Sequence, residues 1–186
     1  MTEALFTIIV STGVLLCIPL IILLLLVRYT RSVPYGEWIR GQIQEHGISF
    51  AFVISLASTL GALIYSNVYL FAVCDFCWYQ RIAIFPMILI LGMAMVRKEV
   101  FVKPYVIALA SVGIVVSVYH WLVHMVAFYG SQSAADSLVP CDATSLIAAC
   151  SKSEILEYGF ITIPFMAIVT LSLIITLMLF IRVRRA

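Results

Sequence analysis

Two pairs of cysteines have spacings that suit redox chemistry. Cys74 and Cys77 form a C-x-x-C, in which two thiols close a small and readily exchanged disulfide. Cys141 and Cys150 are separated by eight residues. Two pairs of thiols that reach each other pass a disulfide along by thiol–disulfide exchange. The simpler alternative is that each pair forms a static disulfide that restrains its segment.

Charged and titratable side chains follow the C-x-x-C at helical spacings. Arg81 comes four residues after Cys77, so on a helix the two side chains share a face. If Cys77 begins that helix, the helix dipole and the guanidinium both favour its thiolate form. His120 and His124 are also four residues apart, but no second histidine pair accompanies them. A buried metal site needs more ligands, so we predict no metal or haem site.

These residues belong to a chain with the composition of a membrane protein. Hydrophobic residues make up 64% and charged residues 11% of the sequence, and the mean hydropathy is +1.15. Soluble domains have roughly 45–50% apolar and 25% charged residues. A helix crosses a bilayer with about 20 apolar residues, and five stretches meet or approach that length. We predict an all-α, polytopic membrane helical bundle with spans at Leu5–Val27, Gly47–Val73, Trp78–Val96, Val102–Tyr129 and Tyr158–Ile181.

The first stretch is interpreted as a retained span. It is longer than the apolar core of a signal peptide, about 7–15 residues, and no Lys or Arg precedes it.

The basic residues predict the orientation of the bundle. Nine of the 11 Lys and Arg residues lie between spans one and two, between spans three and four, or after span five. The positive-inside rule makes that side cytoplasmic. The N-terminus and both cysteine pairs are then outside, where disulfides persist, and the C-terminus is cytoplasmic. The net charge of +2 comes mostly from this cytoplasmic belt and calls for no nucleic-acid partner. Arg81 is an exception, because a cation inside a span is costly and usually functional.

One run of residues resembles a known family. Cys74-Asp75-Phe76-Cys77-Trp78-Tyr79-Gln80-Arg81, followed by Pro86, resembles the DsbB family of disulfide-bond formation proteins, and within it the BdbC-like branch. Residues 159–165, Gly-Phe-Ile-Thr-Ile-Pro-Phe, are similar to that branch's last helix. The chain departs from the family at Val73, where the family often has proline.

The resemblance also predicts the organisation of the chain. It covers Gly47 to Ile181, the family's four-helix core. Residues 47–186 are therefore expected to form the disulfide-generating core. Residues 1–46 are expected to add an extra N-terminal transmembrane helix and a cytoplasmic connector.

What the resemblance implies can be assigned residue by residue. Cys77 is expected to face a membrane quinone, ubiquinone or menaquinone, which Arg81 and His124 help to bind. Cys74 is expected to exchange with the outer-loop pair through Cys150. Cys141 is expected to form the mixed disulfide with a soluble, extracytoplasmic, thioredoxin-like oxidase of the DsbA type. The implied location is a bacterial cell membrane.

Two other functions fit part of the pattern. An enzyme like vitamin K epoxide reductase also combines a membrane C-x-x-C, loop cysteines and a quinone. Its C-x-x-C typically comes late in the helical core, whereas Cys74 follows the first core helix. A transporter or metal carrier with stapled outer loops predicts inert cysteines or bound zinc, and it leaves Arg81 unexplained. We therefore expect a quinone-dependent oxidoreductase that generates protein disulfides.

Overall fold

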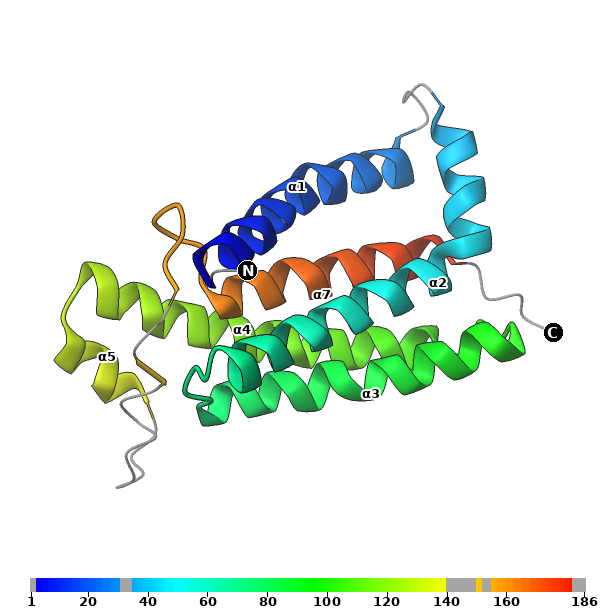
Figure 1. The fold of residues 1–186 in the computed structure, drawn as a ribbon. Helices are drawn as coiled ribbons and strands as arrows, with labels where there is room; N and C mark the ends of the chain where they lie inside the picture. Colours follow the sequence, from blue (N-terminus) through cyan, green and yellow to red (C-terminus); the bar gives the residue numbers. More distant parts are fainter. Residues whose placement is uncertain (1–2, 31–34, 140–149, 152–154, 182–186) are drawn as a thin grey trace.

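The computed structural model describes residues 3–30, 35–139, 150–151 and 155–181. Within them, five helices are long and apolar enough to cross a membrane, and no strand is formed. This confirms the all-α, polytopic membrane bundle. The five helices lie along one another, and a short helix and a π-helical turn connect to them (Figure 1). Their bounds are α1 Glu3–Tyr29, α2 Gly36–Leu63, η1 Ile64–Val68, α3 Asp75–Arg97, α4 Lys103–Tyr129, α5 Gln132–Leu138 and α7 Ile163–Phe180.

The second span begins earlier and ends earlier than the predicted Gly47–Val73. After Leu63 the backbone loosens into η1, and the Tyr69 N–H bonds the Ile64 carbonyl, five residues back, at 3.1 Å. Leu70 then takes a positive φ of 57°, which ends the helix. An extended stretch follows and delivers Cys74 to the start of α3.

The fifth span begins later than the predicted Tyr158. Tyr158 and Gly159 both have positive φ, in a tight turn closed by paired backbone bonds between Glu157 and Ile161. α7 starts only after this turn, with Pro164 in its first turn, where a missing N–H breaks no helical bond. A hydropathy pattern does not locate such a turn, because the turn is defined by backbone φ angles and hydrogen bonds.

α7 is the centre of the bundle. It packs against α4, α2 and α1, and 56% of its most apolar stretch is buried, against 17% for α1. Leu171, Ile174 and Met178 are fully buried in the main core. Gly113 of α4 allows the close approach of α7, since a Cβ there would lie 2.8 Å from Leu171 Cδ1.

Basic side chains bind helix ends at the end of the bundle opposite the α2–α3 connection (Figure 1). Arg40 donates to the carbonyls of Val27 and Thr30 at the end of α1. Lys103 donates to the Ile181 carbonyl just beyond α7, at 2.8 Å. The last carbonyls of a helix have no partner within it, so these cations stabilise the ends that they contact.

Candidate thiol relay site

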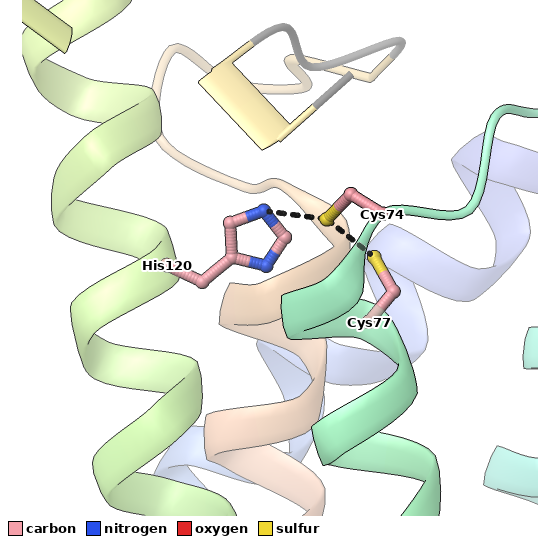
Figure 2. Close-up of side chains that lie close together, drawn as sticks. All are labelled: Cys74, Cys77 and His120. Carbon is pink, nitrogen blue, oxygen red and sulfur yellow. Dashed lines mark hydrogen bonds between the residues drawn. The ribbon is translucent and has the colours of Figure 1, made fainter. Parts of the chain in front are cut away.

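The C-x-x-C is formed by the start of α3. Cys74 is the N-cap residue in an extended conformation, and Cys77 lies in the first turn of the helix. The Trp78 N–H bonds the Cys74 carbonyl at 3.1 Å, which closes that turn. The two sulfurs are 3.6 Å apart and face each other (Figure 2). The first turn of a helix presents unpaired N–H groups and the positive end of its dipole, so this position favours thiolates.

Cys150 joins this pair from a distant part of the chain. It is buried with Cys74, Val123, Ala135 and Val139 in a small cluster at the same end of the bundle. A hydrogen bond from the Cys74 thiol lowers the pKa of Cys150 to about 7, although burial opposes the shift. Bonds from the backbone N–H groups of Asp75 and Phe76 lower the pKa of Cys150 further. The Cys150 sulfur therefore lies over the N-terminus of α3, where it is stable as a thiolate.

Cys74 has the opposite character. Its hydrogen bonds with Cys150 and Cys77, together with its burial, raise the pKa of the Cys74 thiol. Cys74 thus holds the proton in the reduced protein, and its sulfur lies within hydrogen-bonding reach of both other thiols.

His120 points from α4 at the same sulfur (Figure 2). Its Nε2 is 3.7 Å from Cys74 Sγ and 3.2 Å from the Cys150 carbonyl oxygen. A carbonyl can only accept, so this bond requires the proton on Nε2, and the same N–H then faces Cys74. The sequence drew attention to His120 only through its spacing from His124. That spacing does not reveal which histidine meets a cysteine.

Three of the four predicted relay cysteines, Cys74, Cys77 and Cys150, therefore lie together at the start of α3. All described cysteines have free thiols, and Cys17 lies apart from this cluster on α1. Cys141 lies outside the described residues. The roles assigned to these cysteines stay predictions.

Arg81 lies one turn below Cys77 on α3. Its Nη2 donates to the Ala62 carbonyl of α2 at 3.1 Å, and its guanidinium lies 5.3 Å from the centre of the Trp78 ring. The first contact joins the side chain to the last turn of α2, and the second packs it on a ring of its own helix.

A cavity of about 490 Å³ adjoins Cys77 and Arg81. Apart from them and Gln80, most of its walls are aliphatic or aromatic. The Gln80 side chain is only 5% exposed, and its Nε2 has no hydrogen-bond partner among the described residues. The cavity thus combines an apolar interior with an unused donor and a cation beside a thiol.

His124 was expected near the quinone, but its side chain is buried against other residues and does not line this cavity. Its ring packs against the His120 ring with centroids 4.4 Å apart, and it is not among the described residues that line the cavity. Its binding of quinone stays a prediction.

The same side chains also form a possible ligand set for a metal. Cys74, Cys77 and His120 offer three ligand atoms within 4.8 Å of one another. Zinc in structural sites takes four such ligands. The prediction that no metal binds here therefore needs its own test.

The fold and the site define a class: a multi-pass membrane protein with free thiols gathered at one end of a helical bundle. Residues 44–181 match the model of the family described as "Disulfide bond formation protein DsbB". The chain belongs to this family, and its function is disulfide bond formation.

Individual relatives cover most of the same region. The chain is 38% identical over 128 residues to "Disulfide bond formation protein C" of Bacillus subtilis, covering 69% of this chain and 86% of that protein. It is 36% identical over 130 residues to "Probable disulfide formation protein C 1" of Bacillus anthracis, covering 70% and 87%. A "Probable disulfide formation protein" of Coxiella burnetii is 34% identical over 124 residues, covering 67% and 79%. No solved structure matches the chain.

Proposed function

We propose that the protein reoxidises a soluble, extracytoplasmic, thioredoxin-like dithiol oxidase and passes the electrons to a membrane quinone. The observation that carries the proposal is the position of Cys74. Its sulfur lies 3.6 Å from Cys77 Sγ and within hydrogen-bonding reach of Cys150. A relay between two cysteine pairs needs one sulfur that can reach a cysteine of its own pair and a cysteine of the other pair.

The first exchange takes place between the partner and the outer loop. A thiolate of the reduced partner attacks Cys141 of a Cys141–Cys150 disulfide, which forms a mixed disulfide and releases Cys150 as a thiolate. The partner's second thiol then displaces Cys141, so the partner leaves oxidised. Two electrons and two protons have entered the loop pair.

The second exchange takes place at Cys74. The Cys150 thiolate attacks Cys74 of a Cys74–Cys77 disulfide, and Cys77 leaves as a thiolate. The Cys141 thiolate then attacks Cys150, which restores the loop disulfide and releases Cys74. Bonds from the backbone N–H groups of Asp75 and Phe76 lower the pKa of Cys150 and do not depend on a Cys74 thiol, so they favour Cys150 as the attacking thiolate in this step.

His120 acts on the group that leaves in the last step. Its Nε2–H is already fixed by the Cys150 carbonyl and lies 3.7 Å from Cys74 Sγ. It can therefore donate to Cys74 as that sulfur becomes a thiolate. We assign His120 the role of stabilising this leaving group directly.

The cavity beside Cys77 supports a quinone as the acceptor. The Arg81 guanidinium and the Gln80 Nε2, which has no partner among the described residues, are donors suited to quinone carbonyls, and the remaining wall is mostly apolar. A bound quinone would take two electrons and two protons from reduced Cys74 and Cys77, whose disulfide re-forms, and would leave as a hydroquinone. Such an acceptor is needed because strongly oxidising thioredoxin-like proteins have potentials near −120 mV, about 150 mV above ordinary dithiol proteins.

The metal-carrier alternative uses the same sulfur atoms and makes the opposite prediction. A thiolate that coordinates zinc is not free to attack a disulfide. Turnover that persists in the presence of a chelator, in protein that contains no zinc, argues against a resident metal at Cys74, Cys77 and His120.

A turnover assay tests the proposal. Purified protein is mixed with a reduced thioredoxin-like oxidase and a quinone, and quinone reduction is followed by absorbance. We expect reduction by the native protein and none by Cys74→Ser or Cys77→Ser. Absence of reduction by the native protein with both ubiquinone and menaquinone contradicts the proposal.

Arg81 variants then separate binding from thiol exchange. We expect Arg81→Ala to raise the quinone KM about tenfold or more while exchange with the partner stays near native. Arg81→Lys should restore quinone binding only in part, with a KM between those of the native protein and Arg81→Ala, since an ammonium lacks the planar donors of guanidinium. An unchanged quinone KM in both variants assigns Arg81 to the α2–α3 contact alone.

A further inference from the structure

α1 lies outside the part of the chain that matches the family. The family match covers residues 44–181, whereas α1 is Glu3–Tyr29. α1 runs along one side of the bundle and packs mainly against α7 (Figure 1). Its contact with α2 is much smaller. The two helices are therefore joined mainly at one end, where Arg40 binds the last carbonyls of α1.

α1 nevertheless forms a wall of the cavity beside Cys77. Phe6, Val10, Gly13 and Val14 line it from α1. The opposite walls come from α2, α3 and α7, which belong to the family core. Without α1 this side of the cavity would be open to the surrounding lipid.

Two glycines mark free space between α1 and α2. Gly13 on α1 and Gly61 on α2 both line the cavity. A Cβ built on either would meet no atom within 4 Å. The space between these backbones is thus available to a ligand and is not filled by side chains.

The cavity has a polar end and an apolar remainder. Cys77, Gln80 and Arg81 form the polar end, and Gln80 brings a buried donor with no partner among the described residues. The walls from α1 and α7 are largely aliphatic and aromatic. A molecule that fits has a small group with hydrogen-bond acceptors attached to a long hydrocarbon, which describes an isoprenoid quinone.

We propose that α1 completes the quinone site by holding the isoprenoid tail between α1 and α2. This inference rests on the proposed function, since it takes quinone as the ligand. It gives the additional helix a role in ligand selection: quinones with a tail bind better than those without, and the difference depends on the α1 wall.

Photo-crosslinking tests the location directly in the native protein. The probe is a benzoquinone whose prenyl tail carries a diazirine. After irradiation, we expect mass spectrometry to find the label on peptides from Glu3–Tyr29, and excess unlabelled isoprenoid quinone should prevent it. Label confined to other helices overturns the proposal. Label on α1 that quinone does not displace also overturns it, because a lipid chain then occupies the space.

Filling the cavity tests the effect on selection. Gly13→Leu and Gly61→Leu place a side chain in the free space, whereas Gly41→Leu is the matched control. Gly41 also has no atom within 4 Å of a built Cβ, but it lies outside the cavity lining. We expect the first two variants to raise the KM for a long-tailed quinone about tenfold, with kcat and the KM for a tail-less quinone near native. An equal change for both quinones, or no change for either, contradicts the proposal.

The two proposals fail in different ways. If the native protein reduces no quinone, the proposed function is wrong, whatever the crosslink shows. If it reduces tailed and tail-less quinones with equal KM and the label misses α1, only the role of α1 is wrong. The crosslink requires no substitution, so a variant that fails to fold does not leave the role of α1 untested.

Discussion

Cys74 is the residue on which the chemistry converges. It lies between Cys150 and Cys77, and the His120 Nε2 is 3.7 Å from its sulfur. The sequence predicted the C-x-x-C because its spacing is local. The pairing of Cys74 with Cys150, 76 residues away along the chain, was expected only from the family resemblance, and the contact with His120, 46 residues away, was not predicted. Such contacts depend on how the helices pack, and no spacing rule encodes them.

Ionisation of Cys150 provides a prediction at this scale. With a pKa of about 7, the Cys150 thiolate predominates above pH 7. Well below that pH, the thiolate fraction falls about tenfold for each pH unit. The difference in thiolate ultraviolet absorbance between the reduced protein and its Cys150→Ser variant should titrate with a midpoint near pH 7. In a Cys74→Ala background the bond from Cys74 is gone, so the midpoint should move upward. An unmoved midpoint contradicts the assigned cause.

His120 provides a second prediction. His120→Phe removes the N–H that faces Cys74, and a hydrogen bond to a charged group is worth about 1.5–3 kcal/mol. Release of Cys74 from its mixed disulfide with Cys150 should slow by about tenfold or more, as measured by acid quench and alkylation. His120→Gln retains a donor and should recover much of the rate.

The control for this comparison is His46→Phe, since the His46 side chain is half exposed on α2. It should exchange at the native rate. Equal rates for His120→Phe and His120→Gln would show that the effect comes from packing and not from the donor.

At the scale of elements, the positions at which α2 ends and α3 begins determine where the thiol site lies. η1 ends α2 before Tyr69, and α3 begins at Asp75, so the intervening residues carry Cys74 to the α3 N-terminus. Hydropathy predicted that both helices exist but placed the end of the second span at Val73. Hydropathy does not reveal the π-turn, because the turn arises from backbone bonding and is followed by the positive φ of Leu70. Helix existence was predictable here, and the exact site geometry was not.

The contact of α4 with α7 depends on Gly113. A Cβ at this position would lie 2.8 Å from Leu171 Cδ1 and 3.0 Å from Ala83 Cβ. Gly113→Leu therefore overfills the interface, and we expect it to lower stability by about 1–3 kcal/mol. Thermal unfolding in detergent should show a lower midpoint than for Gly41→Leu, where the added side chain meets open space. Equal midpoints would mean that α4 and α7 separate without cost.

At the scale of the whole molecule, the ends of the bundle differ in chemistry. The starts of α1 and α3 and the short α5 lie at one end, and the ends of α1 and α3 lie at the other (Figure 1). The C-x-x-C is at the first end, at the start of α3. Arg40 and Lys103 both bind helix carbonyls at that second end. The predicted orientation, with the thiols outside and the basic residues in the cytoplasm, stays a prediction.

Labelling tests the orientation. In a background without native cysteines, Ser133→Cys should react with an impermeant maleimide added to intact cells. Glu99→Cys, in the exposed connection between α3 and α4, should react only after the membrane is opened. The reverse pattern would place the thiols in the cytoplasm and rule out an extracytoplasmic partner.

The relay itself is tested most directly by trapping it midway. The oxidised protein is mixed with a thioredoxin-like partner that retains only its attacking cysteine, and the disulfides of the product are mapped without reduction. Our account predicts one covalent complex, with the partner bonded to Cys141, Cys150 bonded to Cys74, and Cys77 present as a free thiol. Cys141→Ser should abolish this complex. A partner bonded directly to Cys74 or Cys77, or a complex in which Cys150 never bonds Cys74, would contradict the account.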